Sequence, residues 1–214
     1  MATLLELKTR IRLETNKDDI ASGGEAEAAL TTAIARAIEY YSDEAFWFNR
    51  DSGPSPTTSG TAYVSVPYAV RIPETVSCNG VPLQKVSLSQ IEPLTDRGQP
   101  SHWAENGGII QLWPIPDATY SLSVHGIAQI DAPESDGDET VWTNEAYDLI
   151  AARTRFLLFR DIWRGVEGVQ LAASAEGEAL SRLRKETRRR GIAPLRSTGD
   201  EPWSARSSFN INRG

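Results

Sequence analysis

Two histidines and one cysteine are the side chains of this sequence best suited to catalysis or metal binding. His102 and His125 lie in a stretch of β character, where they could meet across strands and, with a carboxylate such as Asp117, bind a metal ion. Their spacing matches no diagnostic metal motif, and polar residues on a sheet face are the more ordinary interpretation. Cys78 precedes an Asn-Gly pair and reads as a small strand side chain rather than a nucleophile. The sequence therefore predicts no catalytic residue, no metal site and no cofactor.

The short motifs of nucleotide binding, esterase chemistry and zinc proteolysis are absent. The chain contains no G-x-x-x-x-G-K-[ST], G-x-G-x-x-G, G-x-S-x-G or H-E-x-x-H. The acidic stretch DAPESDGDE (131–139) does not space its carboxylates as an EF-hand loop does, so a solvated loop is expected there. Among 29 acidic residues some pair could always serve glycoside hydrolysis, but nothing selects one. We therefore expect a protein that is not an enzyme.

Length and composition favour a folded protein from a reducing compartment. With 214 residues the chain can form one large or two small domains with a real core. Cys78 is the only cysteine, which excludes an internal disulfide framework. No apolar run approaches the roughly 18 residues of a membrane span. The N-terminal MATLLELKTR lacks the pattern of a signal peptide. We expect no membrane span and assembly in a cytoplasm.

The net charge of −7 is distributed unevenly. Residues 182–214 contain nine basic and three acidic residues, so this segment carries +6 and residues 1–181 carry −13. An acidic body with a basic end indicates that the two regions meet different partners.

Helical periodicity occurs at both ends of the chain. Thr3 and Glu6 have the spacing of a capping box, which predicts a helix over 3–13. Apolar residues at a 3.6-residue period predict a longer helix over 25–49. After the polar connection 131–140, Asn144 is the expected cap of another helix.

A further helix follows WRGVEG and ends in RKETRRRG. Its predicted apolar face is formed by Leu171, Ala172, Ala175, Ala179 and Leu183. The cations at its end complement the helix dipole, and Gly191 is placed as the residue after the cap. Residues 192–214 show neither helical nor strand periodicity, and we interpret them as an extended arm.

The central region has the texture of an antiparallel β-module. Residues 50–60 break the helix with Gly, Pro and Ser. The pair Asn79-Gly80 predicts one hairpin, and Asn106-Gly107-Gly108 predicts a second. The strand of GGIIQLWPIPD (107–117) runs into Pro114 and Pro116, which withhold backbone donors and favour an edge position. We expect five or six strands, with a single helical turn within 87–94.

The predicted architecture is α+β. N-terminal helices (1–50) and C-terminal helices (141–191) form one bundle, a small antiparallel β-module (60–130) is inserted between them, and an extended C-terminal arm (192–214) follows. Each helical segment has an apolar face too long to leave exposed, which is why the two should pack together.

The order of these segments and four motifs support a family resemblance. The motifs are P-E-x-V (73–76), G-Q-P-x-x-W (98–103), I-x-L-W-P-x-P-D (110–117) and the alternating strand after them. With these the sequence resembles the head-to-tail connector, or adaptor, proteins of tailed bacteriophages. It resembles in particular the tail tubular A-like adaptors that lie beneath the portal of short-tailed phages. The likeness covers roughly residues 1–190.

The resemblance implies a structural virion protein at the head-to-tail junction, without catalytic activity. Such adaptors form a ring, typically of twelve subunits, that joins the portal protein to the tail nozzle during tail assembly. DNA passes through the lumen on ejection without sequence-specific binding. On this reading the arm and the basic helix end bind the portal through Arg184, Arg188, Arg189, Arg190, Arg196, Trp203, Phe209 and Ile211. The β-module contacts the tail through Trp103, Trp113, Pro114 and Pro116, and the prolines prevent strand addition between neighbouring subunits.

Two other interpretations stay open at this point. Trp103 and Trp113, taken as exposed aromatics beside carboxylates, would suit a glycan-binding or hydrolytic tail component. The basic run RLRKETRRR (182–190) would suit a nucleic-acid-binding protein. An acidic body of −13 weighs against the second, because it repels phosphates at distances up to about 8 Å, the Debye length.

Overall fold

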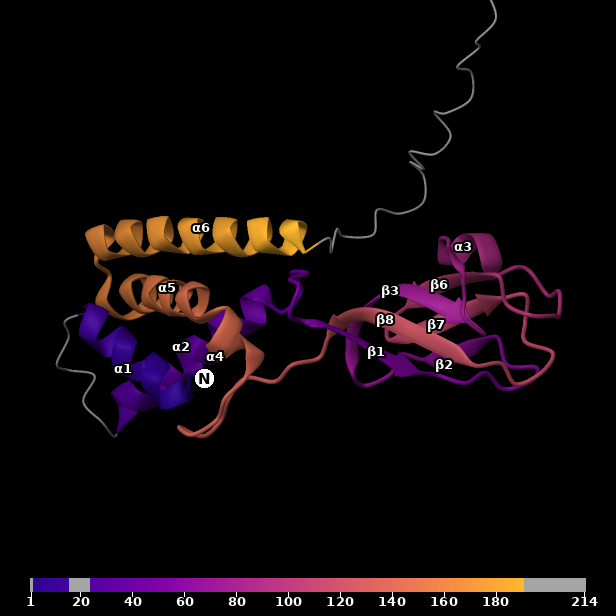
Figure 1. The fold of residues 1–214 in the computed structure, drawn as a ribbon, viewed down its shortest axis with the longest axis horizontal. Coiled ribbons are helices and arrows are strands. Elements are labelled where there is room, and N and C mark those ends of the chain that lie inside the picture. The colour runs from indigo at the N-terminus through magenta and orange to yellow at the C-terminus, as the bar shows by residue number, and fades with distance from the viewer. Residues whose placement is uncertain (1, 16–23, 191–214) are drawn as a thin grey trace, which may run out of the picture. The chain divides into compact units, whose positions relative to one another are not determined.

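The computed structural model describes residues 2–15 and 24–190 of the chain, and it shows a mixed α+β fold (Figure 1). Helices from both ends of the chain pack together, and two small sheets are inserted between them in the sequence. This confirms the predicted fold class. Two compact units are distinguished. Within the described residues, the helical unit comprises 2–52, 68–72 and 126–190, and the β-module comprises 53–67 and 73–125.

The N-terminal helices begin as the sequence predicts, but their ends differ. Helix α1 (Leu4–Thr15) starts with the expected capping box: the Glu6 carboxylate accepts from the Thr3 amide at 3.0 Å, and the Thr3 hydroxyl accepts from the Glu6 amide at 3.2 Å. Helix α2 (Glu25–Tyr41) ends eight residues before the predicted position 49.

Tertiary hydrogen bonds explain why α2 stops early. The buried Asn49 side chain accepts from the Phe46 amide and donates to the Glu44 carbonyl, both at 2.8 Å. These bonds hold a turn that places Phe46 in the core, where it is fully buried. The apolar period through 46–48 therefore reflects aromatic packing and not a continued helix.

The C-terminal helices are α4 (Val141–Glu145), α5 (Tyr147–Leu158), the π-helix η1 (Phe159–Trp163) and α6 (Val166–Arg189). The predicted N-cap Asn144 is wrong. Thr140 caps α4 and accepts from the Thr143 amide, while Asn144 lies inside the helix and accepts from the Ala2 amide at 2.6 Å. Leu171, predicted on the buried face of α6, is exposed.

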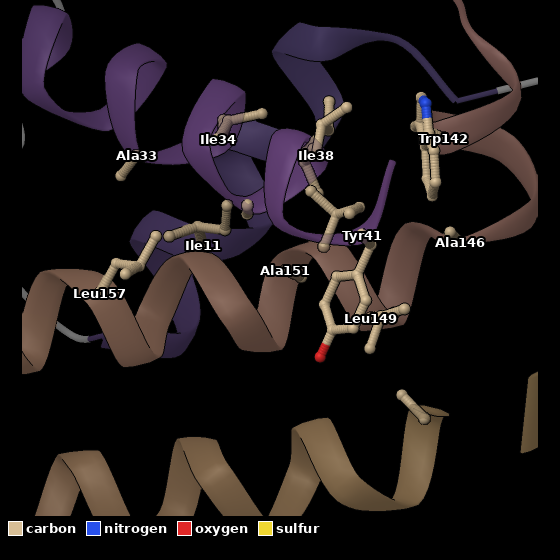
Figure 2. Packing of buried hydrophobic residues seen from close by; sticks show 14 of the residues in the cluster. Ile11, Ala33, Ile34, Ile38, Tyr41, Trp142, Ala146, Leu149, Ala151 and Leu157 are labelled. Atoms are coloured by element: carbon tan, nitrogen blue, oxygen red, sulfur yellow. The ribbon is translucent and has the colours of Figure 1, made fainter. Parts of the chain in front are cut away.

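One hydrophobic core holds the helical unit together, with α5 packed against α1, α2 and α6 (Figure 2). Its largest fully buried side chains in this unit are Trp142, Phe46, Leu4, Leu7, Ile11, Leu30, Ile34 and Leu149. Helix α6 contributes small side chains, with Ala172, Ala179, Leu183 and Thr187 buried. Because α6 buries little apolar surface, polar contacts must supply much of what holds it.

The inserted region contains more strands than expected. The strands are β1 (Arg50–Pro54), β2 (Tyr63–Ser65), β3 (Val70–Cys78), β4 (Val81–Pro82), β5 (Gln84–Lys85), β6 (His102–Asn106), β7 (Ile109–Trp113) and β8 (Leu122–Ala128). They form two four-stranded sheets, ordered β1-β8-β3-β4 and β2-β7-β6-β5. Strand β1 lies within the predicted loop 50–60, and β5 pairs with β6 in parallel. Helix α3 (Leu88–Ile91) is the predicted single turn.

Both predicted hairpins are confirmed. Asn79 and Gly80 join β3 to β4 with φ of 50° and 81°, and Gly107 and Gly108 join β6 to β7 with φ of 57° and 83°. Positive φ at both central residues is the geometry of a type I′ turn, which Asn and Gly adopt most easily. Strand β7, however, lies between β2 and β6, so the predicted edge position is wrong. The chain leaves the ladder after Trp113 through a cis peptide bond to Pro114.

Candidate functional site

The basic end of α6 carries six cations within residues 182–190 and is the first candidate surface. The carboxylate of Glu44 accepts two hydrogen bonds from Arg184, at 2.6 and 2.9 Å. The carboxylate of Glu186 accepts from Arg189 at 2.7 Å and from Arg190 at 2.8 Å. These arginines hold the pKa of the Glu186 carboxyl below its usual value. Three of the four described arginines in the predicted portal-binding set are therefore engaged within their own chain.

Arg188 differs from its three neighbours. It is exposed and has no ion-pair partner within residues 2–15 and 24–190. Lys185, one turn earlier, is exposed in the same way, although the sequence analysis did not select it. The remaining predicted portal-binding residues, Arg196, Trp203, Phe209 and Ile211, lie outside the described residues.

Two further ion pairs fasten α6 to the rest of the helical unit. Arg182 pairs with Asp148 of α5, which also accepts from Arg10 of α1 at 2.6 Å. The hydrogen bond from Arg10, followed by that from Arg182, lowers the pKa of the Asp148 carboxyl against its partial burial.

The second ion pair, between Arg153 and Glu176, is more deeply buried than the pair of Arg182 and Asp148. Arg153 of α5 pairs with Glu176 of α6 at 3.2 Å, and the Tyr41 hydroxyl of α2 donates to the same carboxylate. Burial, reinforced by the hydrogen bond to Glu176, raises the pKa of the Tyr41 phenol. The Arg153 guanidinium lies 3.6 Å from the centre of the Tyr40 ring.

An open groove of about 480 Å³ follows the junction between the end of α2 and α6. Its lining residues are Tyr40, Tyr41, Asp43, Glu44, Ala173, Glu176, Gly177, Leu180 and Arg184. The carboxylates in this lining are paired with arginines. A ligand of this groove would therefore be recognised by its shape more than by an unpaired charge.

The predicted tail-contact residues of the β-module divide into buried and half-buried side chains. Trp103 is 1% exposed, with the Lys85 ammonium 4.6 Å from its ring centre. The expectation that Trp103 is an exposed aromatic is therefore wrong, and the glycan-binding interpretation loses one of its two tryptophans. Pro116 is buried as well. Trp113 and Pro114 are half-buried, and Trp113 packs against His102 with ring centres 5.0 Å apart.

The two histidines do not form a site together. They belong to strands of different sheets, and each contacts a nearby serine hydroxyl: His102 with Ser101 at 2.8 Å and His125 with Ser123 at 3.2 Å. No three His, Cys, Asp or Glu residues of the described part of the chain are grouped to hold a metal ion. Cys78 is buried, and that burial raises the pKa of its thiol, which does not favour a nucleophile.

Comparison with known proteins decides the family. The family described as SU10 adaptor protein matches residues 2–198, nearly the whole chain. The chain belongs to the SU10 adaptor protein family. None of the curated proteins compared with it matches. Family membership gives it the structural role of a phage adaptor protein and not that of an enzyme. Within the described residues, no helix is long and apolar enough to cross a membrane.

An adaptor protein binds its partners through exposed surfaces. The sequence analysis did not identify two exposed apolar surfaces of this SU10 adaptor protein. Leu5 and Leu13 are exposed on α1, and Ile162 and Val166 are exposed where η1 meets α6. The apolar period of α1 predicts that Leu4, Leu7 and Ile11 are buried. Leu5 and Leu13 fall outside this period, which indicates from the sequence alone that they are exposed.

Proposed function

We propose that this SU10 adaptor protein joins the portal of a tailed phage to its tail, as a ring of identical subunits through which the genomic DNA passes. The family match over residues 2–198 carries the proposal. The architecture supports it, because a helical unit and a separate β-module offer two distinct surfaces for two partners.

The charge distribution suits a channel through which DNA passes without binding to the wall. Residues 1–181 carry −13, and a wall of this sign repels phosphates over roughly 8–10 Å. DNA would then pass without sticking, and no sequence-specific contact is required. The proposal places the acidic body around the lumen and the protein in the mature virion.

The portal contact is proposed at the basic end of α6 and the arm after it. Arg188 and Lys185 have no ion pair to break among the described residues, so they can approach an acidic portal surface at little cost. Trp203, Phe209 and Ile211 would fill apolar grooves there, since large side chains among small polar ones suit a segment that orders on its partner. Trp113 and Pro114 are proposed to face the tail nozzle.

Light scattering of the purified protein, alone and mixed with its portal, tests the proposal. A defined complex with a stoichiometric ring of adaptor subunits is expected. A chain that remains monomeric and shows no affinity for the portal would contradict the proposed function. Removing residues 192–214 should abolish portal binding and leave the circular dichroism of the helices unchanged.

A double variant and a single-charge control examine the helix end separately. The double variant Lys185→Ala and Arg188→Ala should weaken portal binding by about tenfold, a loss of roughly 1.4 kcal/mol. Arg160→Ala, which removes an exposed arginine elsewhere on the helical unit, should leave portal binding unchanged. Equal losses in both variants would mean that general charge, and not this surface, attracts the portal.

A further inference from the structure

The exposed large apolar side chains of the helical unit gather mainly in two places. The first is the outer face of α1, where Leu5, Thr9 and Leu13 follow one another at four-residue spacing. This spacing aligns them in one row along the helix. Leu13 is 76% exposed and Leu5 about half exposed. We call this row the α1 ridge.

The second place is the corner between α5 and α6, where Ile162 is half exposed and Val166 is 73% exposed. Beside Ile162 runs an open groove of about 200 Å³ between α2 and the α5–η1 segment. Its apolar lining is formed by Ala29, Ala33, Leu157, Leu158 and Ile162. We call the groove with Ile162 and Val166 the corner groove. Alanines on one wall leave room for a larger side chain from outside.

Specific backbone geometry defines the corner between α5 and α6. The chain changes from α-helix to the π-helix η1, and Arg164 then adopts a left-handed conformation with φ of 52°. The Gly165 amide closes the corner on the Phe159 carbonyl at 3.1 Å. A Cβ atom at Gly168 would lie 2.4 Å from the Phe159 ring, so α6 approaches this ring as closely as a glycine allows. Helical bulges and left-handed non-glycine residues cluster at functional positions, because their cost must be offset elsewhere.

The charges beside the two surfaces are complementary. Glu6 lies next to Leu5 on α1, and Arg164 lies between Ile162 and Val166. Both are exposed, and neither forms an ion pair with any residue that the structure describes. Glu6 on the ridge, held only by the Thr3 amide, and Arg164 at the corner thus carry opposite charges without an ion pair among the described residues, and Glu167 beside Val166 is likewise without one there.

We propose that the α1 ridge of one subunit docks into the corner groove of the next subunit, with Glu6 facing Arg164. This inference rests on the proposed ring and supplies its subunit contact. Leucines at four-residue spacing form a ridge, and such a ridge packs into a groove of complementary shape on a neighbouring surface. Ridge and groove are unlike surfaces on different helices, so the contact is heterologous, and its repetition gives a ring when the rotation between neighbouring subunits closes.

Mixing two complementary variants tests the contact. Leu13→Glu removes the ridge and keeps the groove, and Ile162→Glu removes the groove and keeps the ridge. Each alone should stay monomeric at concentrations at least about tenfold above those at which the wild-type chain assembles. Their equimolar mixture should form one-to-one dimers and nothing larger by light scattering, because each pair retains a single intact contact. Leu171→Glu, at an exposed position outside both surfaces, should assemble like the wild type.

Circular dichroism of each variant confirms folding, which surface positions should preserve. A charge exchange adds a second test: Arg164→Glu, which leaves the capping box of α1 intact, should weaken assembly, and Glu6→Arg in the same chain should restore it. Assembly of Leu13→Glu at wild-type concentrations, or a mixture that stays monomeric, would overturn this contact and leave the ring itself standing. A wild-type chain that fails to assemble both alone and on the portal would overturn the ring and the contact together.

Discussion

Replacing Glu176 by Gln should destabilise the helical unit more than any exposed charge change on α6. Glu176 lies on α6 and receives Arg153 of α5 at 3.2 Å and the Tyr41 hydroxyl of α2. Its side chain is 12% exposed and that of Arg153 is 14% exposed. Glutamine keeps the shape and an acceptor oxygen but removes the charge, so Arg153 would stay largely buried without its counter-ion.

The magnitude follows from the burial of the pair. Removing one partner of a fully buried ion pair costs about 3–5 kcal/mol, because the other charge is left uncompensated. Since both side chains keep a little solvent contact, we expect a loss just below that range, about 2–3 kcal/mol. For a chain of this size each kcal/mol lowers the midpoint of thermal unfolding by about 2–4 °C, which gives roughly 4–12 °C.

Thermal and urea unfolding followed by circular dichroism at 222 nm would measure this loss, since the long helices belong to the helical unit. Arg182→Ala is the matched control on the same helix. It removes an ion pair whose arginine is 66% exposed, and exposed pairs contribute about 0.2–1 kcal/mol. A further variant, Arg153→Met with Glu176→Leu, removes both charges and should recover most of the lost stability.

A free energy of unfolding within about 0.5 kcal/mol of the wild type for Glu176→Gln would refute the reasoning, because surface substitutions alone give changes of that size. It would mean that α6 is held by its small apolar contacts, and that the Arg153 charge reaches water by moving its side chain. A double replacement less stable than the single one would also contradict it.

Three other outcomes are expected from the structure. Gly168→Ala should cost about 1–3 kcal/mol in unfolding experiments, because its methyl group would overlap the Phe159 ring, and an unchanged stability would show that the corner yields. Asp148→Asn should be less stable than the wild type at pH 7 by about 1 kcal/mol. Because arginine hydrogen bonds lower the pKa of Asp148, this difference should persist down to the ordinary aspartate pKa of 3.8 and vanish as the pH falls further, as thermal melts across pH can show. Trp103→Ala should destabilise the β-module by about 3–5 kcal/mol in denaturant titrations, whereas an exposed glycan-binding tryptophan would change stability little.

The sequence predicts well those features that neighbouring residues determine. The capping box at Thr3 and Glu6 forms because both partners lie within one turn of the same helix. The hairpin at Asn79-Gly80 forms because these residues adopt positive φ easily. The packing of N- and C-terminal helices follows from apolar faces that have no other place to be buried.

The features that escaped prediction depend on contacts between distant residues. Helix α2 stops at Tyr41 because Asn49 bonds back to the turn, and no local pattern signals that bond. Strand β1 forms in a Gly- and Pro-rich segment because β8 offers it a partner. The exposure of a tryptophan is equally non-local: Trp103 is buried and Trp113 half-buried, although both stand in similar strands.

The distribution of ion pairs along α6 also bears on the nucleic-acid-binding interpretation. Duplex binding draws its strength from cations that replace condensed counter-ions, and each phosphate contact lowers the logarithm of the affinity by about 0.9 per decade of salt. Four arginines of the run 182–190 are held by carboxylates of their own chain, so binding phosphate would first require breaking those pairs. Lys185 and Arg188 remain, which is too few for a tight electrostatic site on a body of −13. The basic run is better explained as what holds α6 in place, with Lys185 and Arg188 outside any ion pair among the described residues.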